Sequence, residues 1–146
     1  MNSESYQING QIDSVDRAWN EEGILFQEKW YRKSWQVKEI HYYPDFKSIL
    51  FFKNGAGNAL KLYDSSGKLF YEEYYDKNGK IIKLKGTKKV RQNYMGGFYS
   101  LLIYRPNSIL KSTYREYDKK TGEITFEEVY DPKGKLISSK GIKRTY

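Results

Sequence analysis

Two adjacent pairs of glutamates, Glu72–Glu73 and Glu127–Glu128, are the first residues whose types and spacing point to chemistry. Two carboxylates that flank a glycosidic bond can cleave it. Neighbouring residues of a β-strand point to opposite faces, so neither pair can lie on both sides of one bond. Glu72 and Glu127 could still meet across a sheet. With Glu28 they share one position of a sequence repeat, where an acid can pair with a lysine on the next strand, so we predict a structural role.

The other candidate reaction centres are incomplete. His41 is the single histidine and there is no cysteine, so the ligands of a usual zinc site are missing. No G-x-S-x-G segment is present to form a nucleophile elbow, and His41 is interpreted as a strand residue. Asn78-Gly79-Lys80 lacks the further glycines and the Ser/Thr of a P-loop, and the segment from Asp76 lacks the glutamate that closes a calcium loop. Both are predicted to be turns. The sequence predicts no enzyme, no cofactor and no metal.

Two basic runs that contain no acid are the clearest functional signal. KNGKIIKLKGTKKVR, residues 77–91, and KGKLISSKGIKR, residues 133–144, hold equivalent places in a duplicated unit. If the two copies lie side by side, their cations form one surface, and nearby tyrosines add the stacking that single-stranded nucleic acid needs. Lysines that keep edge strands from aggregating would give much of the same pattern. The candidate partner- or anion-binding residues are Lys80, Lys83, Lys85, Lys88, Lys89, Arg91, Lys135, Lys140, Lys143, Arg144, Tyr94 and Tyr99.

An internal repeat predicts the elements that position these residues. Residues 63–86 return as residues 117–141, and a weaker copy covers residues 19–31. The repeated Tyr-Asp-x-x-Gly-Lys places an aromatic residue at a strand end, then an aspartate that bonds the turn backbone, then a glycine where φ is positive. Between these turns the chain is rich in apolar and aromatic residues, and the two-residue period of a strand places Leu69, Tyr71, Glu73 and Tyr75 on one face and Phe70, Glu72 and Tyr74 on the other.

The turns recur at the spacing of an up-and-down antiparallel sheet. We therefore predict an all-β meander of stacked β-hairpins with about 10–13 strands in a single domain over residues 1–146. Aromatic residues on both sides of several strands fit an open twisted sheet and also a sheet rolled into a barrel. Residues 13–23 show a weak helical stripe, but the repeat favours a strand there.

The charge of the chain is +8 and unevenly distributed. Residues 1–30 hold two basic and six acidic residues, a net of −4, so the rest carries +12. A positive body attracts nucleic acid, anionic lipid or an acidic protein, although a lysine-rich solvated surface has the same composition. The sequence shows no export signal and no apolar run of membrane-spanning length, which leads us to expect a cytoplasmic protein.

The segments YDSSGKLFYEEYYDKNGK and YDKKTGEITFEEVYDPKGK resemble the MORN-type repeats of bacterial proteins often described as antitoxins, and they are similar to the YD repeats of large bacterial toxins. This resemblance covers about a third of the chain and implies a hairpin scaffold for protein or membrane contacts, without catalysis. It leads us to expect an immunity- or antitoxin-like protein that binds and neutralises an effector. The alternative is a binder of polyanions, either nucleic acid or an anionic membrane surface, through residues 77–91 and 133–144.

Overall fold

The fold consists entirely of antiparallel strands. A computed structural model describes residues 2–7, 13–94 and 96–144, with side chains from residue 14 onward. The described residues form thirteen strands and no helix. Their bounds are β1 (Asn2–Gln7), β2 (Asp13–Trp19), β3 (Leu25–Arg32), β4 (Trp35–Tyr42), β5 (Phe46–Lys53), β6 (Ala56–Asp64), β7 (Leu69–Tyr75), β8 (Ile81–Gly86), β9 (Lys89–Tyr94), β10 (Phe98–Tyr104), β11 (Lys111–Asp118), β12 (Ile124–Tyr130) and β13 (Leu136–Gly141).

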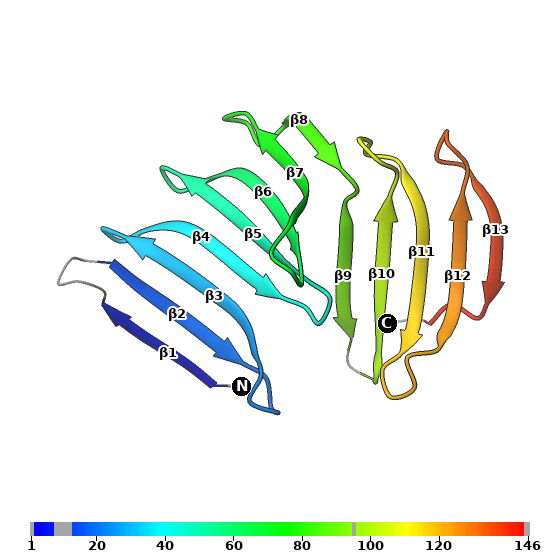
Figure 1. Ribbon diagram of the computed structural model, residues 1–146, viewed down its shortest axis with the longest axis horizontal. Coiled ribbons are helices and arrows are strands. Elements are labelled where there is room, and N and C mark those ends of the chain that lie inside the picture. Colours follow the sequence, from blue (N-terminus) through cyan, green and yellow to red (C-terminus); the bar gives the residue numbers. More distant parts are fainter. Residues whose placement is uncertain (1, 8–12, 95, 145–146) are drawn as a thin grey trace. The chain divides into compact units, whose positions relative to one another are not determined.

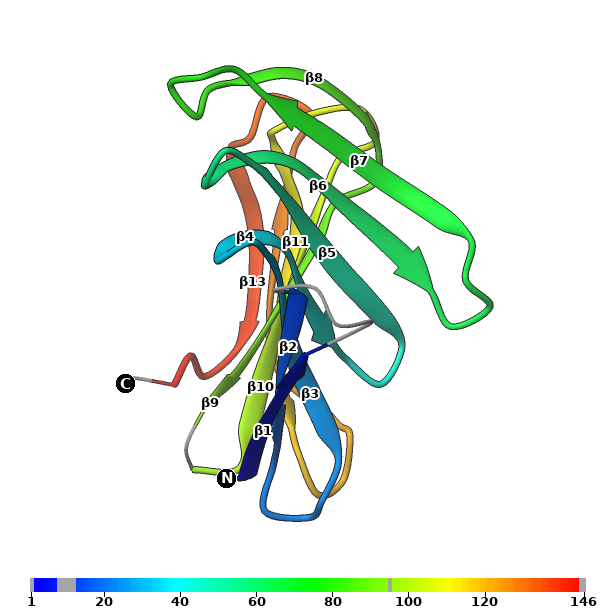
Figure 2. The same ribbon diagram turned by 90° about the vertical axis from the view of Figure 1, so that its left-hand side faces the viewer.

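The strands form two open sheets in which each strand pairs with its neighbour in the sequence (Figure 1). β1 to β8 make an eight-stranded sheet, and β9 to β13 make a five-stranded sheet. Figure 2 shows β5, β6 and β7 following one another in a single layer. The predicted all-β meander is confirmed, and its open form is the one adopted. The chain divides into two compact units, residues 1–84 and 85–146, which are described separately below.

The Asp-x-x-Gly segments form the hairpin turns that the repeat predicts. Oδ1 of Asp76 accepts hydrogen bonds from the backbone nitrogens of Asn78 and Lys80, and Gly79 has a φ of 81°. Asp64, Asp118 and Asp131 bond their own turns in the same way. In the weaker repeat copy, the Asn20 side chain takes this role. Short polar side chains that cap turn amides, followed by glycine in the left-handed region, define these turns.

The repeated glutamates occupy equivalent register positions, as expected. Glu28 lies opposite Arg17, Glu72 opposite Lys61, and Glu127 opposite Arg115. Glu28 and Glu127 form ion pairs of 2.6 Å with these arginines. The predicted cross-strand pairing of acid with base is confirmed in two of the three copies, with arginine in place of the expected lysine, and Glu72 faces Lys61 without an ion pair.

The eight-stranded sheet has a small core divided between its two faces, whereas the buried residues of the five-stranded sheet, Phe98, Ser100, Glu116 and Phe126, share one face. In the eight-stranded sheet, Val15, Ile40 and Ala59 are buried on one face, and Leu62 and Tyr71 on the other. Since neighbouring strands of one layer bury only part of each side chain, many residues stay half-exposed on both faces. The sheet therefore presents broad, accessible surfaces built from side chains that the strand register holds in place.

Buried glutamates are held by tyrosine hydroxyls. Glu73 is 2% exposed and accepts hydrogen bonds from Tyr71, at 2.6 Å, and from Tyr75. Glu116 is fully buried and accepts one from Tyr114 at 2.7 Å. Each tyrosine lies two residues from its glutamate and so on the same face of the strand. These glutamates act as acceptors that satisfy tyrosine hydroxyls inside the sheet.

Candidate polyanion-binding face

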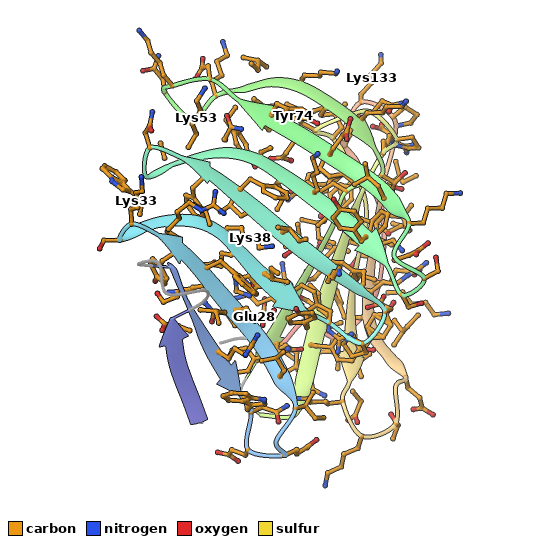
Figure 3. The ribbon with its side chains drawn as sticks, turned by 60° about the vertical axis from the view of Figure 1, so that its left-hand side comes forward. Glu28, Lys33, Lys38, Lys53, Tyr74 and Lys133 are labelled. Atoms are coloured by element: carbon orange, nitrogen blue, oxygen red, sulfur yellow. The ribbon has the colours of Figure 1, made fainter. Side chains whose placement is uncertain are left out.

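A row of alternating cations and aromatic rings crosses one face of the eight-stranded sheet, and Figure 3 labels two of its members, Lys38 and Tyr74. The even-numbered strands β2, β4, β6 and β8 each place a basic side chain on this face, and β3, β5 and β7 each place a ring. In strand order, the members are Arg17, Trp30, Lys38, Phe51, Lys61, Tyr74 and Lys83. We name this set the cation–aromatic row, and the face that carries it the cationic face.

The lysines of the row lie beside the rings of the adjacent strands. Lys38 Nζ is 4.8 Å from the centroid of the Trp30 ring, and Lys61 Nζ is 5.6 Å from that of Phe51 and 5.8 Å from that of Tyr74. Contacts of this kind contribute about 0.5–1 kcal/mol at exposed sites. Within the described part of the chain, Lys38 and Lys61 make no ion pair, and neither does Lys83. Glu72 lies opposite Lys61 in the register without forming an ion pair, so the ammonium groups of all three lysines can attract an anion.

Arg17, at the start of the row, belongs to a partly buried cluster around Glu28. Its Nε donates a hydrogen bond of 2.6 Å to one carboxylate oxygen, and the Tyr42 hydroxyl donates to the other. Burial alone would raise the pKa of Glu28, but the hydrogen bonds from Tyr42 and Arg17 and the arginine charge outweigh it and lower the pKa below its ordinary value. Burial, together with the hydrogen bond to Glu28 and its charge, raises the pKa of Tyr42, so this hydroxyl stays protonated.

Replacing Glu28 by glutamine is expected to destabilise the fold in a pH-dependent way. Glu28 is 5% exposed, and loss of its charged hydrogen bonds should cost about 1.5–3 kcal/mol at pH 7. Because the folded pKa lies below the unfolded value near 4.5, the stabilisation by Glu28 is present above pH 4.5 and is lost as the pH falls through the folded pKa.

Urea unfolding of the parent and of Glu28→Gln between pH 3 and pH 7 measures this effect. Glu22→Gln is the matched control, because that side chain is exposed in a turn of the same unit. A destabilisation of Glu28→Gln that stays constant down to the lowest pH would contradict the assignment.

The opposite face of the same sheet is richer in acids. Asp16, Glu39 and Glu73 point to this side, since they alternate with Arg17, Lys38 and Glu72 along their strands. Glu39 contacts His41 Nε2 at 2.8 Å and Lys29 at 4.0 Å. His41 is thus a strand residue, as predicted. The two faces differ in charge, and an anionic ligand should prefer the cationic face.

The residues predicted from the basic runs are distributed over both sheets. Lys80 lies in the turn before β8, and Lys83 and Lys85 lie on β8; of these, Lys83 is part of the cation–aromatic row. Lys88 lies directly before β9, and β9 and β10 carry the next four residues, Lys89, Arg91, Tyr94 and Tyr99. Lys135 precedes β13, Lys140 is on β13, and Lys143 and Arg144 follow it.

The strands of the two runs in the five-stranded sheet are not neighbours. β9 and β13 are its opposite edges, because β10, β11 and β12 pair in sequence order between them. Their side chains nevertheless share a face. One register row contains Arg91, Leu101, Arg115, Glu127 and Lys140. Arg91 also lies 3.9 Å from the Tyr99 ring centroid, and this ring stacks on Tyr117 with centroids 4.8 Å apart. Tyr94, Lys143 and Arg144 lie on the other face.

Most of the cation–aromatic row was not predicted from the sequence. Trp30, Lys38, Phe51, Lys61 and Tyr74 belong to no run of like charge, since each stands between residues that point to the opposite face. The sequence signal that could have identified the row is a basic residue on one strand that lies opposite or diagonal to an aromatic residue on the next strand of the hairpin. Finding it requires the register of each hairpin.

No family model matches the chain, and no curated protein matches it. Among solved structures, it is similar to a mutant of S. aureus TarM in complex with Fondaparinux, alpha-GlcNAc-glycerol and UDP, at 12% identity and a TM-score of 0.38, over 79% of this chain and 19% of that chain. A second TarM structure aligns at 12% identity and a TM-score of 0.32, over 88% of this chain and 19% of the other. The chain thus spans about a fifth of the TarM chains. At these scores the likeness assigns neither fold nor function.

The described residues contain no helix of the length and apolar character that a membrane span requires. They also contain no group of three or more His, Cys, Asp or Glu side chains arranged to hold a metal ion.

Proposed function

We propose that this protein is a non-enzymatic binding module that holds a single-stranded polyanion, with single-stranded nucleic acid as the best-fitting class, on the cationic face. The observation that carries the proposal is the cation–aromatic row. Single-stranded nucleic acid presents phosphates and flat bases in alternation, and proteins bind it with positive grooves and aromatic side chains. The row offers both kinds of group in alternation across β2 to β8.

The regular spacing of the row favours a linear polymer over a folded protein. Neighbouring strands are about 4.8 Å apart, so cations on every second strand recur at about 10 Å, and the row from β2 to β8 extends about 29 Å. A repeating polymer can engage several such positions at once, whereas a folded protein surface has no such repeat. The ammonium groups that make no ion pair, on Lys38, Lys61 and Lys83, supply the phosphate contacts.

An acidic protein effector is the second candidate, in keeping with the immunity- or antitoxin-like interpretation of the repeats. The observation in its favour is the apolar exposure along β13, where Leu136 and Ile137 are 46% and 61% exposed. Protein interfaces use apolar and tyrosine-rich surface of this kind. For both candidates, the role is binding, and the protein carries out no reaction.

Binding of a fluorescently labelled single-stranded oligonucleotide of mixed sequence, measured by anisotropy between 50 and 300 mM salt, tests the proposal. Three cations that each neutralise one phosphate should give a slope of log K against log salt of about −2. The duplex of the same sequence should bind more weakly, because its bases are not free to contact the rings. Vesicles that contain anionic lipid are the third ligand to be compared with the single strand and the duplex.

Absence of oligonucleotide binding at 100 mM salt would contradict the nucleic-acid proposal. Equal affinity for the duplex and the single strand would show that the aromatic rings do not contribute to binding. Tighter binding to vesicles than to oligonucleotides would favour an anionic membrane surface as the partner.

A further inference from the structure

The five-stranded sheet carries a hollow of about 270 Å³ on the face opposite Tyr99. Ser100 and Leu102 of β10 form its floor, and β9, β11 and β12 supply its sides. Its other lining residues are Val90, Gln92, Tyr94, Lys111, Tyr114, Glu128, Tyr130 and Lys143. The hollow does not include any member of the cation–aromatic row, so it is independent of the function proposed above.

The segment after β13 forms one wall of this hollow. In Figure 1 residues 142–144 return across β12 and β11 toward β10. The backbone nitrogen of Arg144 donates a hydrogen bond of 2.9 Å to Oε1 of the buried Glu116. The guanidinium of Arg144 lies 4.7 Å from the Phe98 ring centroid and 3.8 Å from Asp118 Oδ2. These contacts anchor the segment and hold Lys143 at the hollow, with Nζ 5.4 Å from the Tyr114 ring centroid.

Two ammonium groups without carboxylate partners line the hollow. Lys143 comes from the returning segment, and Lys111 from β11, where its Nζ is 5.7 Å from the Tyr130 ring centroid. Considering the described residues alone, neither lysine forms an ion pair. Two cations that converge on one small space attract an anion, and a phosphate is suited to accept hydrogen bonds from both.

The other polar groups of the hollow require a ligand that also donates hydrogen bonds. Glu128 Oε1 accepts a hydrogen bond of 3.1 Å from the Tyr130 hydroxyl, which leaves its second oxygen for a ligand donor. Burial and the nearby Glu128 charge raise the pKa of Tyr130, so this hydroxyl stays protonated and keeps donating. On the floor, Ser100 Oγ donates to the Tyr94 hydroxyl at 3.3 Å. A hydroxyl-bearing ligand satisfies Glu128, whereas a bare anion would be repelled by it.

We propose that this hollow binds a small phosphorylated sugar, with the phosphate at Lys111 and Lys143 and the sugar hydroxyls at Glu128. The volume of about 270 Å³ lies just under the usual range for drug-sized ligands and admits a molecule of sugar-phosphate size. The apolar side chains of Val90 and Leu102 and the three tyrosine rings provide flat surface against which a sugar ring packs. The same chemistry is found in a free sugar phosphate and in the ribose phosphate of a mononucleotide.

Isothermal titration calorimetry with ribose 5-phosphate, AMP, inorganic phosphate and neutral ribose tests this site on the full chain. Ribose 5-phosphate should bind, and ribose should not. AMP binding tighter than ribose 5-phosphate assigns the ligand to the nucleotides, and equal binding assigns it to the sugar phosphates. Lys111→Gln and Lys143→Gln should each weaken binding at least about tenfold.

Two further variants make the result specific. Lys120→Gln removes the same charge from an exposed turn of the same unit and should leave the affinity unchanged. Glu128→Gln should weaken binding of ribose 5-phosphate but not of inorganic phosphate, a difference that net charge alone would not produce. The proposal is overturned if ribose 5-phosphate does not bind, if ribose binds as well, or if all three lysine variants lose affinity equally. Oligonucleotide binding on the cationic face is measured separately, so the two proposals can fail independently.

Discussion

Glutamine at Lys38, Lys61 and Lys83 together is expected to lower the affinity for a single-stranded oligonucleotide by about 100-fold at 0.1 M salt. Three phosphate contacts contribute about 2 to the slope of log K against log salt, so the slope should fall from about −2 toward zero. The physical reason is that bound polymer releases fewer counterions when fewer of its phosphates meet a cation. Anisotropy titrations across the salt range measure both quantities. These lysines make no ion pair among the described residues, so the triple variant should keep its fold.

The matched control is the triple variant with glutamine at Lys53, Lys68 and Lys77. These lysines are exposed at or beside hairpin turns of the same unit, and their replacement changes the net charge by the same amount. If the control loses as much affinity and slope as the row variant, the overall charge of the protein explains binding and the row has no special part. Retained affinity in the control, with loss in the row variant, places the polymer on the cationic face.

Gly141→Ala is expected to be the most destabilising single substitution considered for the five-stranded sheet. Gly141 has a φ of 92°, and a Cβ added there would lie 2.2 Å from the Thr125 carbonyl oxygen and 3.1 Å from Phe126 Cα. Both neighbours are backbone atoms of β12 and cannot rotate away. Left-handed backbone costs a residue with Cβ about 1–2 kcal/mol, and overpacking adds about 1–3 kcal/mol, so we expect a loss of about 3 kcal/mol or more in the free energy of unfolding.

Gly122→Ala separates the two causes of that loss. Gly122 has a φ of 73°, but nothing lies within 4 Å of a Cβ added there, so only the backbone cost of about 1–2 kcal/mol should appear. Urea unfolding followed by circular dichroism measures both variants. Equal losses in the free energy of unfolding would show that the close contact between Gly141 and the β12 backbone does not contribute to the destabilisation. Since Gly141 lies directly before the segment that carries Lys143, its substitution should also weaken binding at the hollow.

Periodicity and turn chemistry predicted most of the fold. The aspartate and asparagine caps at Asp64, Asp76, Asp131 and Asn20 identify their turns, because a short polar side chain followed by glycine has few other stable conformations. Residues 13–19, which also showed a weak helical stripe, form β2, as the repeat indicated. Whether the sheet closes could not be predicted, because closure depends on the pairing of its first and last strands, which local pattern does not specify.

The candidate site was only partly predictable, since binding residues on a sheet are assembled across strands. Lys83 was identified from a basic run. Lys38 and Lys61 belong to no such run, and they become candidates only once the fold places them beside the rings of Trp30 and Phe51. Conversely, Lys89 and Lys140 come from different runs and lie on opposite edge strands of the five-stranded sheet. A run of charge in the sequence identifies residues that are adjacent along the chain. A ligand on a sheet contacts residues that come from different strands.

The strict alternation of the cation–aromatic row has a consequence for how such proteins can evolve. Each hairpin of the eight-stranded sheet, β2–β3, β4–β5 and β6–β7, contributes one cation and one ring. Duplication of a hairpin would lengthen the row by about 10 Å without disturbing the existing positions, because a meander accepts a new hairpin between its neighbours. Under the proposed function, the number of hairpins would set the length of the row. Proteins of this fold with more or fewer hairpins should then require a proportionally longer or shorter polymer for full binding.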